Sequence, residues 1–522
     1  MYTISQILTQ SAHRVPNKTA FQSGNESITF SEADQKTNQI AHFLITKGLK
    51  KGDRVGVFLN RNERSALAVH GILKAGGVFV PIDMDAPTER IQFILDDCKV
   101  NFLISEEGLA NKLKTFIDSI SSELVILGIE IAHTTHSFFS WKSINHFRTH
   151  VPDIKILSSD LAYIMYTSGT TGFPKGIMHT HYSGLSYAKL SKDLYKITES
   201  DVVANHSPLH LDMSTLGYIT APLAGATCII LGKQYSVFPA SLSELIEQEK
   251  ITVWYSVPLV LQQLLERGDL KNRDLSSLRW VLFGGEPFPV HQLNQFLEHC
   301  PNAFFSNVYG PAEVNQCTFY NHKGKIKKYD SVPLGLVWSD TDHLILDENN
   351  IEIKQGDVGE LLIHSSTMMY GYWNNQELTI KSILDIVSTS GVKKKYYKTG
   401  DLVKEDDNGF LHFMGRKDRQ IKTRGHRLEL SEIEETILRY NETKLAACYS
   451  YKINGVNEIF ASVVLRSDAL IEEVELKLRK ALPKYSVPKL ILETKKLPRT
   501  SAGKVDYEKL TQEISAIYDS KN

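Results

Sequence analysis

One short stretch of the chain, from Tyr166 to Gly176, contains three glycines, four Ser or Thr residues and a lysine (Tyr-Thr-Ser-Gly-Thr-Thr-Gly-Phe-Pro-Lys-Gly). Glycine lets backbone N–H groups approach an anion, hydroxyl groups add donors, and lysine adds a positive charge. The stretch therefore predicts a phosphate-binding loop, although an ordinary turn can have the same composition. It is not the common P-loop, G-x-x-x-x-G-K-[ST], because Gly176 follows Lys175.

The elements that would position this loop follow an α/β pattern. Apolar runs alternate with helical patterns through the first part of the chain, which favours α/β layers. We expect a helix over 31–48 with Ser31 at its N-cap. The expected strands are 54–59, 78–81, 161–165, 226–231, 251–255, 279–283 and 303–308. Open α/β sheets bind ligands beyond the carboxyl ends of their strands, so chemistry is expected in the turns there.

Length and composition narrow the class of protein. A chain of 522 residues is too long for one hydrophobic core, so two or more domains are expected. The net charge of −1 gives no basic field, so neither nucleic acid nor a membrane surface is an expected partner. Five scattered cysteines without a C-x-x-C pair indicate neither disulfides nor a zinc site, and they fit a reduced cytoplasm. We find neither a signal peptide nor an apolar run long enough to span a bilayer.

Beyond residue 340 the pattern changes to hairpins. One hairpin is expected from 343–346 and 351–353, and a second from 401–404 and 410–413, where Asn408-Gly409 marks the turn.

A short, highly charged stretch, Gly415–Gln420, follows the second hairpin. We place a domain boundary there, between an N-terminal domain of residues 1–417 and a C-terminal domain of residues 418–522. The C-terminal part is long enough for a small α+β domain.

The loop at Tyr166 resembles the signature loop of the adenylate-forming enzymes, which include acyl-CoA synthetases, luciferases and the adenylation domains of nonribosomal peptide synthesis. Five more stretches resemble motifs of this family, in the same order. They are Asn307–Glu313, Gly359–Trp373, Tyr397–Leu402, Gly415–Leu430 and Leu497–Asp506. Because six motifs in order support one another, the chain is identified as a member of this family. The resemblance implies a large multi-layered N-terminal domain and a small, mobile C-terminal lid domain.

In this family a carboxylate attacks the α-phosphorus of ATP, so catalysis depends on positioning and electrostatics. The resemblance implies two catalytic residues: Glu313, which holds Mg²⁺, and Lys504, which bridges the carboxylate and the α-phosphate. It implies that Asp401 and Arg416 bind the ribose. The other residues implied in ATP binding are Thr167, Ser168, Gly169, Thr170, Thr171, Gly172 and Lys175 around the phosphates, and Gly284, Gly285, Glu286, Asn307, Tyr309, Gly310 and Ala312 elsewhere in the nucleotide site.

The resemblance also implies a second step. Asp418 stands where the family hinges, and rotation there would withdraw Lys504 and present the loop at Gly425, which opens a channel for a thiol. The sequence ends at Asn522 without a carrier domain or a serine attachment motif. A free-standing ligase that serves a separate, phosphopantetheinylated carrier protein is therefore expected.

Asp212 bears on which acid is activated. The stretch His210–Ser214 resembles a motif of amino-acid adenylation domains in which the aspartate pairs with the substrate's ammonium group. A buried ammonium group needs a carboxylate beside it, although a helix N-cap is an alternative role for Asp212. The remaining pocket positions implied by the family are Met213, Leu216, Tyr255, Leu282, Gly284, Val308, Gln316, Cys317 and Lys504.

This largely apolar lining resembles that of free-standing enzymes that load L-proline onto a carrier protein, so L-proline or a close analogue is the expected substrate. Gln316 departs from that group, and because a buried amide needs partners, it would mark a substituted or more polar substrate. Ala312, Leu211 and Ala502 also depart from the usual family residues, but none of these changes removes a charged group.

Three alternatives stay open. An acyl- or aryl-CoA synthetase would not need Asp212. A D-alanine:carrier-protein ligase would use it, but such enzymes usually have a cysteine near the position of Phe283. A non-catalytic nucleotide-binding regulator would not need the charged residues Lys504, Glu313 and Asp401.

Overall fold

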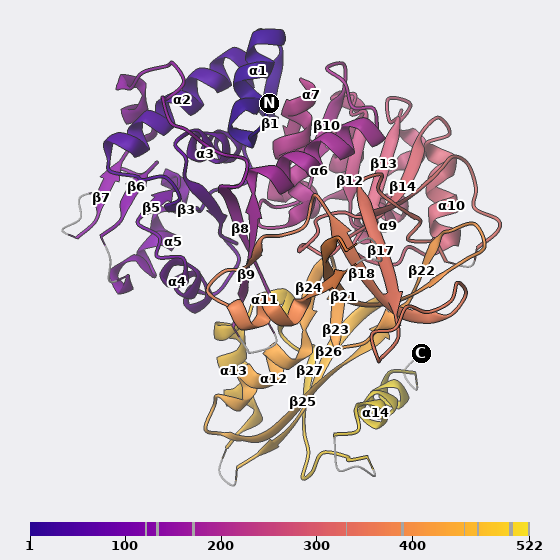
Figure 1. Cartoon of the computed structure of the whole chain (residues 1–522). Helices are drawn as coiled ribbons and strands as arrows, with labels where there is room; N and C mark the ends of the chain where they lie inside the picture. The colour runs from indigo at the N-terminus through magenta and orange to yellow at the C-terminus, as the bar shows by residue number, and fades with distance from the viewer. Residues whose placement is uncertain are drawn as a thin grey trace. The chain divides into compact units, whose positions relative to one another are not determined.

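Two structural units divide the chain in the computed structural model (Figure 1). The first unit consists of residues 1–84, 95–165 and 176–417, and the second of residues 85–94, 166–175 and 418–522. The residues that the structure describes are 1–120, 123–131, 135–169, 173–329, 331–387, 391–453, 455–466, 469–500 and 505–519.

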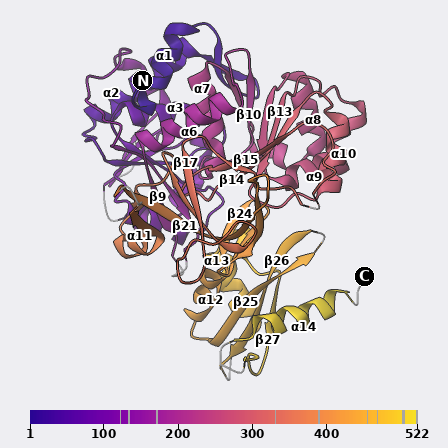
Figure 2. The same cartoon turned by 45° about the vertical axis from the view of Figure 1, so that its right-hand side comes forward.

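A large mixed sheet forms one layer of the first unit. Its central strands are parallel and nearly all their residues are buried, as expected for strands covered on both faces. In spatial order they are β14 (Phe304–Tyr309), β13 (Trp280–Gly284), β12 (Val253–Ser256), β10 (Val202–Asn205), β11 (Thr227–Ile230) and β1 (Thr19–Ser23). Helices α8 (Pro239–Gln248), α9 (Pro258–Arg267) and α10 (Val290–His299) cover one face of this sheet (Figure 2).

A second sheet forms another layer. Its neighbouring strands are β19 (Gly371–Tyr372), β9 (Lys175–Thr180), β8 (Leu161–Thr167), β4 (Val78–Pro81), β3 (Arg54–Val57), β5 (Phe102–Ile104), β6 (Val125–Leu127) and β7 (Ser137–Phe139). One hydrophobic cluster joins both sheets, because it includes Phe21 and Val203 of the first sheet with Val55 and Phe79 of the second. Each of the seven strands predicted between residues 54 and 308 is present, with ends shifted by two residues at most, so the α/β fold class is confirmed.

The helix predicted over 31–48 is present as α2 (Phe30–Thr46), but its N-cap is Thr29 and the assignment to Ser31 was wrong. Thr29 Oγ1 accepts a hydrogen bond from the Glu32 N–H at 3.3 Å, and the Glu32 carboxylate accepts one from the Thr29 N–H at 2.9 Å. This reciprocal capping box satisfies two N–H groups at the helix start, whereas Ser31 lies inside the first turn.

A third sheet follows in the chain, with neighbouring strands β17 (Thr341–Leu346), β18 (Val358–Ser365), β21 (Lys393–Glu405) and β20 (Ile383–Val387), while β22 (Leu411–Arg416) pairs with β21. The hairpin predicted around Asn408-Gly409 is confirmed as β21–β22. The other predicted hairpin is present only as a short antiparallel ladder, in which Leu346 bridges to Glu352, the Asp347 N–H bonds to the Ile351 carbonyl at 2.9 Å and the Ile353 N–H bonds to the Ile345 carbonyl at 3.0 Å. The other edge of β17 pairs along its whole length with β18, which the sequence did not predict. Pairing with β18 buries Leu361 and Ile363, whereas Ile351 stays exposed.

This third sheet lies against the ends of both larger sheets. Leu361 and Val403 pack in one hydrophobic cluster with Ile177 of β9 and Tyr309 of β14. The carboxyl end of β14 therefore meets β18 and β21, and side chains from three sheets converge there.

The C-terminal part of the second unit is a small α+β arrangement. Its sheet consists of β25 (Thr443–Ile453), β26 (Val456–Leu465) and β27 (Leu490–Glu493). Helices α12 (Leu430–Leu438) and α13 (Ile471–Ala481) pack in one hydrophobic cluster with this sheet, and α14 (Tyr507–Asp519) packs in another (Figure 2).

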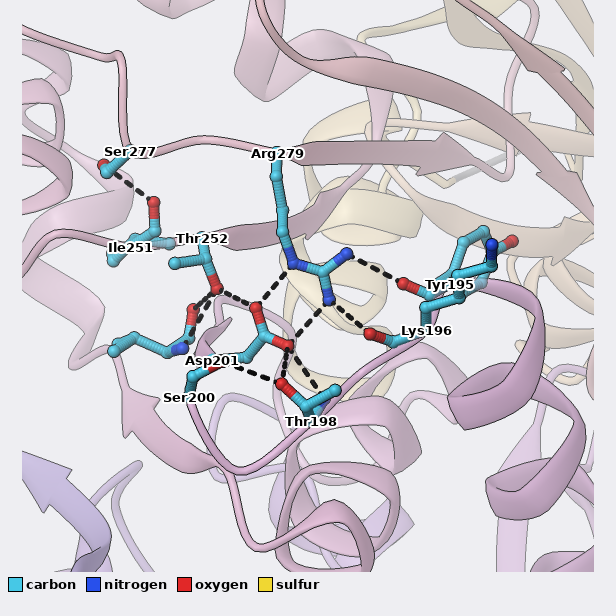
Figure 3. A network of polar contacts seen from close by, with 10 residues as sticks. Tyr195, Lys196, Thr198, Ser200, Asp201, Ile251, Thr252, Ser277 and Arg279 are labelled. Carbon is cyan, nitrogen blue, oxygen red and sulfur yellow. Dashed lines mark hydrogen bonds and ion pairs between the residues drawn. The ribbon is translucent and has the colours of Figure 1, made fainter.

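A partly buried ion pair joins the amino-terminal ends of β10, β12 and β13 (Figure 3). The Asp201 carboxylate accepts hydrogen bonds from Arg279 Nε at 2.6 Å, from Thr252 Oγ1 at 2.7 Å and from the Thr198 N–H at 2.8 Å. Burial alone would raise the pKa of Asp201, but these donors outweigh it and hold the pKa below the ordinary 3.8. The network therefore stabilises the sheet at the edge opposite the strand ends that carry the site residues.

Replacing Arg279 with methionine is expected to lower the free energy of unfolding by about 2 kcal/mol at pH 7. The loss is at the low end for such pairs because the Arg279 side chain is 34% exposed, although that of Asp201 is only 3% exposed. Urea titration measures the change. The difference from wild type should shrink below pH 3.8, as Asp201 becomes protonated.

Lys325→Met is the control, since Lys325 and its partner Glu298 are both more than half exposed. It should change the free energy of unfolding by less than about 0.5 kcal/mol. Equal effects of the two variants would contradict a stabilising role for the Asp201 network.

Candidate active site

The adjacent strands β13 and β14 end at the residues predicted to bind the nucleotide. Gly284 pairs with Val308, and a Cβ atom on Gly284 would lie 2.1 Å from the Val308 carbonyl oxygen. No larger residue fits there without moving the strand. Gly285 and Glu286 follow on the chain, and the Asn307 amide donates to the Pro333 carbonyl at 2.7 Å. The structure therefore places these predicted residues together at the carboxyl edge of the sheet.

Tyr309, Asp401 and Arg416 form one polar cluster. Tyr309 Oη donates to Asp401 Oδ2, and Arg416 Nη1 contacts Asp401 Oδ1, both at 2.5 Å. The register of β21 and β22 explains the second contact, because it pairs Asp401 with Arg416. Burial, then the nearby Asp401 carboxylate, raises the pKa of Tyr309 well above 10, so its hydroxyl stays a donor. The predicted ribose residues are thus brought together, and the hydroxyl contact of Tyr309 is new.

Glu313 is fully buried in the loop after β14. Its Oε1 accepts a hydrogen bond from Tyr372 Oη at 2.8 Å, and its backbone carbonyl accepts one from the Met369 N–H at 2.7 Å. The buried His179 donates from Nε2 to the Ala312 carbonyl at 2.9 Å. Burial lowers the pKa of His179 to about 4, so this imidazole is neutral at pH 7 and does not offset the charge of Glu313.

A hard cation such as Mg²⁺ fits Glu313, because Mg²⁺ is bound through one or two carboxylates together with waters and substrate phosphates. In the described part of the chain, no three His, Cys, Asp or Glu side chains come together as a metal site. Sequence reasoning missed Tyr372 as a partner of Glu313, although Gly371–Trp373 belongs to a stretch that matched a motif.

Several residues predicted to bind the substrate side chain come together, whereas Cys317 packs in a different cluster, with Tyr309 and Leu361. Leu216, Tyr255, Leu282 and Val308 belong to one hydrophobic cluster, and Met213 packs against it. Tyr255 reaches Gln316, whose Nε2 donates to Tyr255 Oη at 2.7 Å. The side chains in this group that are at most 5% exposed are Leu216, Tyr255, Leu282, Val308, Gln316 and Cys317.

Asp212 begins a short 3-10 helix, Asp212–Ser214, whose N-cap is Leu211. Asp212 is therefore not the N-cap itself, although its Oδ1 accepts a hydrogen bond from the Met213 N–H at 2.9 Å. Asp212 is also one of the charges that raise the pKa of Tyr255, after burial and Tyr187. The carboxylate thus lies within electrostatic range of the buried tyrosine.

The segment predicted to bind phosphate begins at the end of β8, where the Oγ1 atom of Thr167 is buried without a hydrogen-bond partner among the described residues. Ser168 is buried, and a Cβ atom on Gly169 would lie 2.1 Å from the Phe173 carbonyl oxygen. Lys175 begins β9. The predicted residues outside the described part of the chain are Thr170, Thr171, Gly172 and Lys504.

Two further predicted residues lie in the second unit. The Asp418 carboxylate accepts a hydrogen bond from the Gln420 N–H at 3.1 Å. Gly425, with a φ of +82°, lies in the turn between β23 (Gln420–Thr423) and β24 (His426–Glu429). The hinge role of Asp418 and the thiol-channel role of Gly425 stay predictions.

Comparison with known families decides the class. A family model described as AMP-binding enzyme matches residues 8–373, which is well over half of the chain. The chain belongs to the AMP-binding enzyme family. A second model, the AMP-binding enzyme C-terminal domain, matches residues 432–504.

Relatives of this AMP-binding enzyme differ greatly in length. Gramicidin S synthase 2 of Brevibacillus brevis is 31% identical over 98% of the chain, but the chain spans only 11% of that protein. The L-proline--[L-prolyl-carrier protein] ligase of Pseudomonas fluorescens is 28% identical over 98% of the chain and is covered completely.

Solved structures agree on the fold of the AMP-binding enzyme. The Vibrio cholerae adenylation domain AlmE, in complex with glycyl-adenosine-5'-phosphate, superposes with a TM-score of 0.87 at 22% identity. The match covers 99% of this chain and 98% of that one. Within its described residues, the AMP-binding enzyme has no helix that is both long enough and apolar enough to span a membrane.

Proposed function

We propose that the chain activates an amino acid as an aminoacyl adenylate and transfers it to the phosphopantetheine thiol of a separate carrier protein. The observation that carries this proposal is the place of Asp212, a carboxylate whose chain neighbour Met213 packs against the largely apolar cluster that contains Leu216 and Tyr255. Its charge is also one of the causes that raise the pKa of Tyr255, after burial and Tyr187. An acid without an amine would not need that charge. L-Proline or a close analogue is the proposed substrate, supported by the apolar lining and by the full-length similarity to the L-proline ligase.

In the first step, an oxygen of the substrate carboxylate attacks the α-phosphorus of ATP and pyrophosphate leaves. We assign Asp401 and Arg416 to the ribose, Tyr309 to the adenine and the segment from Thr167 to Lys175 to the phosphates. Glu313 would hold Mg²⁺, which offsets phosphate charge when bound. Lys504 would bridge the carboxylate and the α-phosphate. These groups act by position and charge, as expected for transfer at phosphorus.

In the second step, the carrier thiol attacks the acyl carbon, AMP leaves, and a thioester forms. We propose that residues 418–522 act as the lid domain, that rotation at Asp418 withdraws Lys504, and that the loop at Gly425 then lines the thiol path. The five cysteines are buried and none is in a disulfide, which supports a place for this chemistry in a reducing cytoplasm.

Amino-acid-dependent ATP–pyrophosphate exchange tests the proposal across L-proline, pipecolate, D- and L-alanine, larger aliphatic amino acids and aryl acids. We expect a sharp response to L-proline or a ring analogue, followed by a mass increase of a phosphopantetheinylated carrier protein. Exchange only with acids that lack an amine would contradict the role of Asp212. Efficient transfer to coenzyme A instead of the carrier would favour the CoA-ligase class.

A further inference from the structure

Gln316, one of the residues predicted to line the substrate site, carries a buried polar atom whose bonding is incomplete. Its side chain is 3% exposed and donates from Nε2 to Tyr255 Oη at 2.7 Å. Its Oε1 atom is buried and has no hydrogen-bond partner among the described residues. Because buried polar atoms are almost always bonded, and an unmet one destabilises the interior, this oxygen favours a ligand that supplies a donor.

The loop that carries Gln316 is tightly packed, so it cannot easily move to give the Gln316 Oε1 atom another hydrogen-bond partner. A Cβ atom on Gly310 would lie 2.3 Å from the Asn315 carbonyl oxygen and 2.7 Å from the Gln316 Cα atom. The Cys317 N–H also bonds to the Tyr309 carbonyl at 2.9 Å, which closes the loop on itself. The backbone of Gln316 is therefore packed against Gly310, and its side chain is held by Tyr255.

Gln316 and Asp212 lie on segments that contact each other. Burial, followed by the effects of Tyr187 and Asp212, raises the pKa of Tyr255 well above 10, so the phenol is neutral at physiological pH. The loop of Gln316 also contacts the helical turn of Asp212, because Asn315 Nδ2 donates to Thr215 Oγ1 at 3.5 Å and Thr215 Oγ1 donates to the Asp212 carbonyl at 2.6 Å. A substrate whose ammonium group pairs with Asp212 would have its side chain in the cluster of Leu216, Tyr255 and Val308, within reach of the Gln316 amide.

We propose that the substrate is an amino acid whose side chain carries an O–H or N–H donor that bonds to Gln316 Oε1. This inference rests on the proposed function and narrows it. A hydroxylated ring amino acid meets both the apolar lining and the amide oxygen, whereas unsubstituted L-proline leaves that oxygen without a donor.

The test compares kcat/KM in ATP–pyrophosphate exchange within matched pairs: 3- or 4-hydroxy-L-proline against L-proline, and L-threonine against its near-isostere L-valine. The donor-bearing member should be favoured at least about tenfold in the pair that the enzyme accepts. 4-Oxo-L-proline, which only accepts hydrogen bonds, should do no better than L-proline. Gln316→Leu should remove or reverse the preference.

The matched control is Gln292→Leu, because Gln292 lies outside the pocket and accepts a hydrogen bond from Gln262 at 2.7 Å. It should leave the ratio unchanged. A wild-type preference for the apolar member or for 4-oxo-L-proline, or no preference at all, would overturn the inference even if Gln316→Leu failed to fold. If none of the amino acids supported exchange, the proposed function would fail as well. If L-proline were used as efficiently as its hydroxylated analogues, the proposed function would stand and only the inference that the substrate carries a hydrogen-bond donor would fail.

Discussion

Replacing Asp212 with asparagine is expected to lower kcat/KM for the amino acid by about 10²- to 10³-fold, with the KM for ATP unchanged. Asparagine keeps the oxygen that accepts the hydrogen bond from the Met213 N–H, so the 3-10 helix at Asp212–Ser214 should survive. Only the negative charge is lost, and the substrate ammonium group would then be buried without a counter-charge. Steady-state ATP–pyrophosphate exchange, with the amino acid and ATP varied in turn, measures the effect.

The control for this prediction is Asp193→Asn, since the Asp193 side chain on α6 (His181–Leu194) is 75% exposed. It should leave both constants unchanged. An unchanged kcat/KM in the Asp212 variant would mean that the carboxylate serves only the local backbone, and the enzyme would then belong with those that activate acids without an amine.

Replacing Glu313 with glutamine is the second large expected effect. The first half-reaction should slow by about 10²- to 10³-fold, the size usual for removing one electrostatic group from a transition state. The amide has nearly the same shape and can still accept the hydrogen bond from Tyr372 Oη, so the fold should persist. The Mg²⁺ concentration for half-maximal exchange should rise, because a neutral amide is a weaker ligand for a hard cation than a carboxylate.

Tyr372→Phe distinguishes the effect of the Glu313 charge from the effect of the hydrogen bond that Tyr372 donates to it. It removes the hydroxyl that donates to Glu313 Oε1 and leaves the carboxylate in place. We expect a loss of about tenfold, since one hydrogen bond to a charged group is worth about 1.5 kcal/mol. If Glu313→Gln and Tyr372→Phe slowed exchange equally, with the Mg²⁺ dependence unchanged, the assignment of Glu313 as the metal residue would fail.

Only the folded chain reveals how the buried carboxylates are partnered. Tyr309 and Asp401 are 92 residues apart in the sequence, and Tyr372 and Glu313 are 59 apart, yet each pair shares a hydrogen bond. The motifs named three of these four residues and assigned them to a ligand, but not to each other. Such contacts depend on how β21 of the third sheet and β19 of the second sheet pack against the end of β14, and no local pattern encodes that.

The sequence by itself determined the α/β class and its strands through their hydrophobic period, and the β21–β22 hairpin through its Asn-Gly turn. It also determined the membership of the AMP-binding enzyme family through the ordered motifs. Each of these signals is a property of residues that are close together in the chain. Only the tertiary structure decided that β17 pairs with β18, since burial of Leu361 and Ile363 selects that register. It also decided that Gln316, 61 residues from Tyr255, donates its N–H to that phenol, while its oxygen has no donor within the part of the chain that the structure describes. Packing between distant segments sets which buried polar atoms are satisfied, and therefore what a ligand must supply.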